Sequence, residues 1–270
     1  MPNGAQPDVA VVLEARQLNK KFGAVTAAND INVRIEQDSV VGLIGSNGAG
    51  KTTFINMVTG YLRPTSGRIL YQEQDITGLQ PRRITELGIC RSFQIPQLFN
   101  TLSVYDNILV ATGIAARSLR ADASARGAHH DRQQAEQLIE RFSLSSYREQ
   151  AAGSLPEGVR KLLDIAMAVA GGPRVLLLDE PTSGVSADEK FRLMDMVMTA
   201  LAAEGVTVLF VEHDMEIVGR YTHRILAFYE GRIIADGEPQ KVLQDAEVRR
   251  YVIGEQLHVN ARKEAARAAD

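Results

Sequence analysis

The stretch GSNGAGKT, from Gly45 to Thr52, constrains the fold of this chain of 270 residues more than any other feature. It matches the pattern G-x-x-x-x-G-K-[ST], in which glycines let backbone N–H groups converge on phosphate oxygens without a side-chain clash. The apolar run SVVGLIG precedes it as a buried strand, and KTTFINMVTGYL follows it with helical spacing. This strand–loop–helix order is the context that a phosphate-binding loop requires.

We therefore expect the chain to bind a nucleotide together with Mg²⁺. Lys51 would reach the outer phosphates, and Thr52 would offer its hydroxyl to Mg²⁺. The N-terminus of the following helix would point at the same anion. The residues of the loop expected to bind the nucleotide are Gly45, Ser46, Asn47, Gly48, Ala49, Gly50, Lys51, Thr52 and Thr53.

The rest of the chain alternates between strand-like and helix-like segments. VVLEARQL and INVRIEQ have the pattern of half-exposed strands, and SGRILYQEQDIT is typical of one further strand. Later, the strands RVLLLDE and VTVLFVEHD flank the helix DEKFRLMDMVMTALAAEG, and THRILAFYEGRIIADG follows as a strand hairpin. This rhythm predicts an α/β fold: a P-loop NTPase core with a mainly parallel sheet, plus an antiparallel β subdomain.

Strand signals disappear between about Ile89 and Gly158, where helical stretches rich in Ala, Gln and Arg dominate. We expect an inserted helical subdomain there, with ARSLRADASARGAHH as a surface loop or frayed helix. The predicted division is an ATP-binding core of residues 1–88 and 159–255, a helical subdomain of residues 89–158, and a charged tail of residues 256–270.

Composition narrows the classes of function. A net charge of -3 gives no support to a nucleic-acid partner. The single cysteine, Cys90, rules out an internal disulfide and suits a reducing compartment. The sequence shows neither a signal-peptide pattern nor a long apolar run, so any membrane role is expected to come through a partner. The pair His129 and His130 lacks companions at metal-ligand spacing.

Polar residues end two of the predicted buried strands. Asp179 and Glu180 end VLLLDE, and burying both acids unpartnered would be costly, so the strand is expected to open onto a polar site. Asp179 would hold Mg²⁺ through its water shell, and Glu180 would orient or deprotonate a water. His213, at the end of VLFVEH, would hydrogen-bond a phosphate and the base. The alternative is a strand that ends in solvent, with the acids capping the next helix.

The order of these segments resembles the ATP-binding subunits of ABC transporters. A glutamine, a helical insertion, LPEG with a helix, LLLDEP and VEHD follow the phosphate loop, and the likeness runs from about Leu13 to Glu255. GICRSFQIPQLFNTLSVYDNILVA and GRIIADGEPQKVLQDAEVRRYVIGE are similar to the ATPases of branched-chain amino-acid importers. The resemblance implies an ATPase, with ATP and Mg²⁺ bound, that drives uptake of branched-chain amino acids or a related small solute.

The resemblance also implies roles for individual residues. Glu180 would be the catalytic base, His213 the switch histidine, and Gln94 the link between Mg²⁺ and the helical subdomain. Phe22 would stack on adenine. The Mg²⁺ ligands would be Thr52, Gln94 and Asp179. The loop Ser183–Ser186 would cross to the other protomer, although Ser186 stands where the family often has aspartate.

The implied partners are a second ATPase subunit that is a different chain, two membrane permease subunits and, indirectly, a periplasmic solute-binding protein, with no nucleic acid. The implied location is peripheral, on the cytoplasmic face of the inner membrane. The ATPase of a lipid or lipopolysaccharide exporter has a similar ending and is an alternative. A non-transport ABC ATPase is another, although the sequence has no second ATPase module, coiled coil or basic patch. The substrate and the choice between homodimer and heterodimer stay open.

The signature departs from the family pattern L-S-G-G-Q. This chain presents Leu155, Pro156, Glu157, Gly158 and Val159 to its partner. The lost serine hydroxyl would have hydrogen-bonded a charged group, an interaction worth roughly 1.5–3 kcal/mol. We expect a helix here, capped by Ser154 and begun near Pro156, and a signature weakened toward the partner's nucleotide. The alternative is a tolerated substitution with both sites working.

Overall fold

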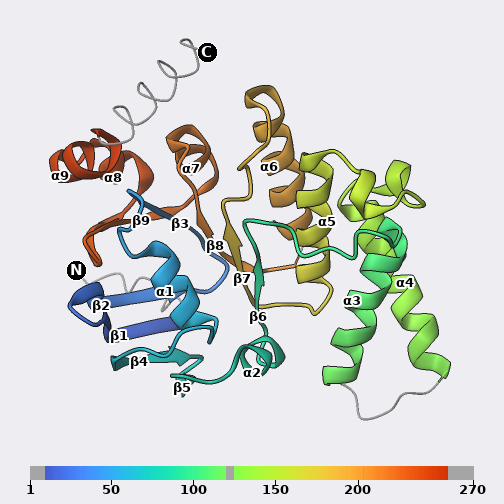
Figure 1. Ribbon diagram of the computed structural model, residues 1–270, viewed down its shortest axis with the longest axis horizontal. Helices are drawn as coiled ribbons and strands as arrows, with labels where there is room; N and C mark the ends of the chain where they lie inside the picture. Colours follow the sequence, from blue (N-terminus) through green and yellow to red (C-terminus); the bar gives the residue numbers. More distant parts are fainter. Residues whose placement is uncertain (1–9, 120–124, 203, 255–270) are drawn as a thin grey trace, which may run out of the picture. The chain divides into compact units, whose positions relative to one another are not determined.

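The computed structural model describes residues 10–119, 125–202 and 204–254 (Figure 1). The chain divides into two compact units, one of Met1–Leu79 with His223–Asp270 and one of Gln80–Thr222. The predicted tail, residues 256–270, lies outside the described residues. Within those residues, no helix combines the length and the apolar character that crossing a membrane requires.

The first unit contains the predicted antiparallel sheet. Its strands are ordered β2-β1-β4-β5, with the bounds β1 Val11–Phe22, β2 Val25–Glu36, β4 Ser66–Tyr71 and β5 Gln74–Asp75. In β2 the side chains of Ile31, Val33 and Ile35 are buried at alternate positions. This period of two buries one face of the strand, as the sequence pattern predicted.

The segment SGRILYQEQDIT is two strands, so its prediction as a single strand was wrong. β4 and β5 pair antiparallel, with Tyr71 opposite Gln74. The chain reverses through Gln72 and Glu73, which have φ angles of 47° and 66°. A two-residue turn of this kind needs left-handed backbone at both positions, for which the usual sequence signal is Gly, Asn or Asp. Gln and Glu carry no such signal.

The strand that leads into the phosphate loop, β3 Val40–Gly45, is buried throughout and runs parallel to β9 Arg224–Tyr229. β10 Arg232–Gly237 pairs antiparallel with β9, which confirms the predicted hairpin. The helix after the loop, α1 Lys51–Val58, ends earlier than KTTFINMVTGYL suggested. The chain turns away at Gly60, whose φ is 78°. The unit continues with α8 Pro239–Gln244, α9 Ala246–Val248 and a π-helical turn Arg249–Ile253.

The second unit contains three parallel strands. β7 Val175–Asp179 lies between β6 Ile89–Ser92 and β8 Thr207–Val211. Every residue of β7 and β8 is buried, which agrees with their continuous apolar sequences. β6 falls in the region expected to lack strands, so that expectation was wrong. With four residues, Ile-Cys-Arg-Ser, β6 is too short to show a period.

Helices make up the rest of this unit. The long helices α3 Val104–Leu119 and α4 Ala125–Arg141 lie side by side, which confirms the predicted helical insertion (Figure 1). ARSLRADASARGAHH is helical where it is described, including both histidines, while residues 120–124 lie outside the described residues. The remaining elements are α2 Pro81–Glu86, α5 Glu157–Val169, α6 Ala187–Ala202, α7 Met215–Tyr221 and the 3₁₀ turns Ser145–Tyr147 and Ala152–Ser154.

Two glycines of the first unit test the packing of its antiparallel sheet. Gly67 has a φ of 92°, and a Cβ there would lie 2.3 Å from the carbonyl oxygen of Gln17. Gly23 is also left-handed, with a φ of 57°, but a Cβ there would meet nothing within 4 Å. We predict that Gly67→Ala lowers the free energy of unfolding by more than about 3 kcal/mol. Gly23→Ala, the matched control, should cost about 1–2 kcal/mol. Equal shifts of the urea midpoint would contradict the steric argument.

Candidate functional site

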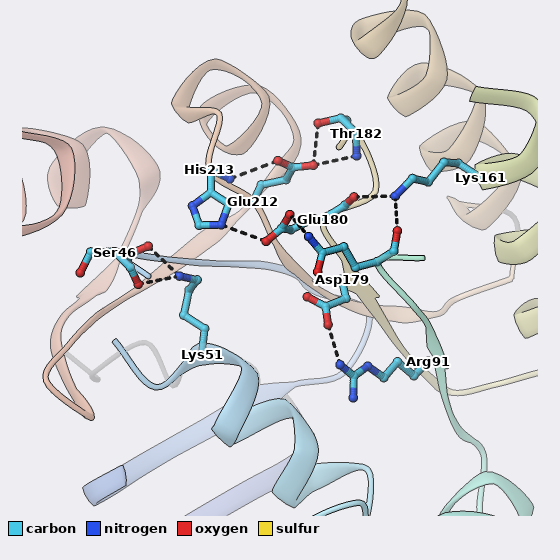
Figure 2. Close-up of polar contacts among 11 residues, drawn as sticks. Ser46, Lys51, Arg91, Lys161, Asp179, Glu180, Thr182, Glu212 and His213 are labelled. Atoms are coloured by element: carbon cyan, nitrogen blue, oxygen red, sulfur yellow. Dashed lines mark hydrogen bonds and ion pairs between the residues drawn. The ribbon is translucent and has the colours of Figure 1, made fainter. Parts of the chain in front are cut away.

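The phosphate loop joins β3 to α1 within the first unit. Gly50, just before α1, has a φ of 106°, and a Cβ there would lie 2.6 Å from the carbonyl oxygen of Ala27. The nearly buried Lys51 lies back over the loop and donates from Nζ to the carbonyl oxygens of Gly45 at 2.6 Å and Ser46 at 3.1 Å (Figure 2). The first turn of a helix leaves backbone N–H groups without intrahelical partners. The loop therefore combines a cation, such N–H groups and glycine backbone, which is the chemistry that holds phosphates.

Phe22 is exposed, unlike most aromatic side chains of this chain. It ends β1 with 51% of its surface exposed. The Nζ of Lys20 lies 5.0 Å from the centroid of its ring. An exposed ring of this kind is able to stack on a flat heterocycle, and the family resemblance implies adenine as that heterocycle.

Three of the predicted catalytic residues meet in the second unit. The Glu180 carboxylate accepts a hydrogen bond from Gln94 Nε2 at 2.7 Å, and its other oxygen lies 3.0 Å from His213 Nε2 (Figure 2). Gln94 follows β6, Glu180 follows β7 and His213 lies just beyond β8. Because these three strands are parallel, their carboxyl ends lie at the same edge of the sheet. The alternative prediction was that the strand ends in solvent and that its acidic residues only cap the next helix. Glu180 does not fit this alternative, because its carboxylate contacts Gln94 and His213.

The backbone of Glu180 is in an unusual conformation. Its φ is 49°, left-handed for a residue with a long side chain. Its N–H donates to the carbonyl oxygen of Val211 at 3.0 Å. Strain of this kind persists only where the surroundings hold it, and it concentrates at functional sites. The turn directs the carboxylate toward Gln94 and His213.

Asp179 has a partner that the sequence did not indicate. Its carboxylate pairs with the guanidinium of Arg91 at 2.5 Å, and each of these two side chains is less than 10% exposed. In the parallel register Arg91 lies opposite Leu177, so Arg91 and Asp179 are on the same face of the sheet. Because β6 was not predicted as a strand, nothing in the sequence indicated that Arg91 would lie beside Asp179.

Glu212 was also missed, although it lies between Val211 and His213. It is buried and accepts hydrogen bonds from Thr182 N at 2.9 Å, Thr182 Oγ1 at 2.7 Å and His213 N at 3.1 Å. Burial raises the pKa of the Glu212 carboxyl above its ordinary value, and the hydrogen bonds from Thr182 and His213 oppose this effect. Its bonds fix the start of the loop that follows β7 to the end of β8.

The signature begins a regular helix. Pro156 directly precedes α5, and Glu157 is its first residue. The prediction that Ser154 caps this helix was wrong. Ser154 ends a 3₁₀ turn and its hydroxyl donates to the carbonyl oxygen of Ala151, with extended backbone at Leu155 and Pro156 separating it from α5. The carboxylate of Glu157 lies 3.8 Å from the guanidinium of Arg160, so a cation is close to the added negative charge.

Ser186 has a definite role at the start of α6. Its hydroxyl hydrogen-bonds the carboxylate of Glu189 at 2.8 Å, and its carbonyl oxygen accepts from the N–H groups of Glu189 and Lys190. The pair has the spacing of the S-x-x-E capping box. Ser186 thus marks the end of the loop Ser183–Ser186 and the beginning of the helix.

The ABC transporter family profile matches residues 28–183. The chain is 33% identical over 250 residues to the high-affinity branched-chain amino acid transport ATP-binding protein BraF of Pseudomonas aeruginosa, a match that covers 90% of this chain and 98% of BraF. It is 32% identical to the corresponding protein LivG of Escherichia coli K12, again over 90% of this chain and 98% of LivG.

Solved structures agree. The ADP conformation of MJ1267, an ATP-binding cassette of an ABC transporter, superimposes with a TM-score of 0.77 at 29% identity, covering 90% of this chain and 98% of that one. A nucleotide-free cassette from an ABC transporter gives a TM-score of 0.75 at 28% identity, covering 88% of this chain and 97% of that one. The chain is therefore an ATPase of the cassette class, and it belongs to the ABC transporter family. Within that family it is similar to the ATP-binding proteins of branched-chain amino acid transport.

The buried Glu212 generates a prediction about pH. Because its pKa is raised in the folded chain, its contribution to stability is complete below the ordinary value of 4.5 and is lost as the pH rises through the raised value. Glu212→Gln cannot titrate and should remove this part of the pH dependence. As the pH rises above 4.5, the free energy of unfolding should fall more steeply for the wild type than for the variant.

Urea unfolding at several pH values measures this difference. Glu140→Gln, on an exposed position of α4, is the matched control and should keep the wild-type slope. An unchanged slope in Glu212→Gln would show that the carboxyl is ordinary in the folded chain.

Proposed function

We propose that this chain is the ATP-hydrolysing subunit of an importer that takes up branched-chain amino acids or a related small solute. The observation that carries the proposal is the Glu180 carboxylate held between the Gln94 amide and the His213 imidazole. A general base must be both oriented and able to accept a proton, and these two neighbours supply the orientation. The importer class comes from the likeness to BraF and LivG.

In the proposed mechanism the phosphate loop binds the phosphates of ATP through its N–H groups and Lys51. Lys51 exchanges its bonds to the Gly45 and Ser46 carbonyls for the outer phosphates. Glu180 takes a proton from water as the water attacks the γ-phosphate, which releases ADP and phosphate. His213 bonds the base through Nε2 and keeps the carboxylate directed at the water.

Each of the residues proposed to bind Mg²⁺ has a side chain whose chemistry suits that ion. Hard oxygen ligands suit Mg²⁺, and Thr52, Gln94 and Asp179 offer a hydroxyl, an amide carbonyl and a carboxylate. When bound, the ion neutralises charge on the phosphates. The Asp179 oxygen that pairs with Arg91 has a partner already, which leaves the other oxygen as the candidate for the water shell.

We further propose that the functional unit pairs this chain with a second, different ATPase subunit and with two permease subunits at the cytoplasmic face of the inner membrane. A solute-binding protein would be an indirect partner. The argument for a different second chain rests on the signature. Its Pro156 N-cap makes no side-chain cap hydrogen bond, and Glu157 adds a carboxylate in the first turn. Negative charge at a helix N-terminus competes with a phosphate for the same N–H groups.

Two substitutions separate binding from hydrolysis. Glu180→Gln should lower kcat for ATP by at least about 100-fold while ATP still binds, since it removes the base and keeps the side-chain shape. Lys51→Ala should instead weaken ATP binding, since it removes the cation of the phosphate loop. Phosphate release and equilibrium binding of labelled ATP measure the two effects. Glu140→Gln serves as the control with wild-type behaviour. A Glu180→Gln variant of normal kcat would refute the assignment of the base.

The asymmetric dimer makes its own prediction. In a complex with the second subunit, ATP on this chain faces the partner's signature and is hydrolysed well, whereas ATP on the partner faces LPEGV and turns over slowly. Glu180→Gln in this chain alone should therefore remove nearly all ATPase activity of the complex. Retention of about half of the activity would mean that both sites work equally, as expected for two independent sites. Steady-state ATPase assays of the reconstituted complex decide between these outcomes.

A further inference from the structure

Two charged side chains lie on the buried face of α5, the helix that follows the signature. Lys161 is 3% exposed and Asp164, one turn further along, is 6% exposed. Burying a charge is costly unless hydrogen bonds compensate for the lost water. The hydrogen bonds of these two side chains therefore identify the segments of the chain that α5 holds in place.

Lys161 bonds to the backbone of both Gln94 and Glu180. Its Nζ donates to the carbonyl oxygen of Gln94 at 2.6 Å and to that of Glu180 at 3.2 Å (Figure 2). These are the two residues whose side chains meet at 2.7 Å. One ammonium group thus fixes the main chain on both sides of that contact.

Asp164 bonds to the chain on either side of Gln94. Its Oδ2 accepts from Ser92 Oγ at 2.6 Å and from Phe93 N at 3.2 Å, and its Oδ1 accepts from Gln97 N at 2.8 Å. The segment Ser92–Gln97, the glutamine loop, is therefore gripped before and after Gln94. A carboxylate with three donors is a satisfied buried charge, and losing it would leave those donors unpaired.

We propose that Lys161 and Asp164 are positioning residues that clamp the glutamine loop to α5 and set Gln94 against Glu180. The inference rests on the proposed function for the roles of Gln94 and Glu180. Because Leu155–Val159 span the start of the same helix, the clamp joins the signature offered to a partner to the protomer's own Gln94–Glu180 pair. A shift of α5 would carry the glutamine loop with it.

The test compares four variants of the full chain. Lys161→Met removes the ammonium group, Lys161→Arg restores a donor, and Asp164→Asn replaces one acceptor oxygen by a donor. Arg141→Met is the control, since it removes a half-exposed cation paired with Glu204 in the same unit. ATPase kinetics of each variant in complex with the second ATPase subunit give kcat and KM, and amide hydrogen exchange of the chain reports on the peptide that contains Phe93 and Gln97.

We expect Lys161→Met to lower kcat about tenfold or more with KM for ATP changed by less than about twofold, because displacement of catalytic groups acts on the chemical step. Lys161→Arg should recover part of the loss. Asp164→Asn should accelerate exchange in the Phe93–Gln97 peptide, and Arg141→Met should change neither readout. In a Gln94→Ala background, Asp164→Asn should cost little further activity, because it acts through Gln94.

Wild-type exchange in Asp164→Asn, an undiminished kcat in Lys161→Met, or a full additional loss in the Gln94→Ala background would overturn the clamp. If Asp164→Asn does not fold, Ser92→Ala removes a single bond of the same carboxylate and should raise exchange in the same peptide. Unchanged exchange in Ser92→Ala would also count against the clamp. A wild-type chain that binds no ATP would refute the proposed function, while the exchange data would still decide on the clamp.

Discussion

The parallel pairing of β7 with β8 is the constraint on which the second unit depends. Both strands are buried along their whole length, and Asp179 lies opposite Val211 in their register. The two strands therefore deliver their next residues, Glu180 and Glu212, to the same edge of the sheet. Neighbouring carboxylates at a buried edge repel each other and lose water, so each needs its own donors. Gln94 donates a hydrogen bond to Glu180, and Thr182 donates two to Glu212.

Much of this site could be predicted from the sequence. The glycine-rich loop has a fixed spacing with a physical reason for each residue type. Asp179, Glu180 and His213 stand where apolar runs end, which is a visible change of pattern. Gln94 had little signal by itself and was placed only by the resemblance to a family, and the structure brings its amide to Glu180.

The residues that support the site could not be found in the same way. Arg91 depends on β6, a strand too short to show a period. Lys161 and Asp164 look in the sequence like ordinary polar positions of an amphipathic helix, and only the packing of α5 shows that they are buried. The turn at Gln72 and Glu73 was missed because neither residue is a usual former of left-handed backbone. Tertiary packing, rather than local preference, decides all of these positions.

The hydrogen bond between Ser186 and Glu189 at the start of α6 bears on which residues position 186 accepts. Serine and aspartate are about equally good N-cap residues in general, but aspartate at position 186 would replace the hydroxyl that donates to the Glu189 carboxylate by a second negative charge. The contact with Glu189 therefore favours serine over aspartate at this position. Positions 186 and 189 are therefore coupled, and an exchange of Ser186 for aspartate is accommodated most readily together with a change at Glu189.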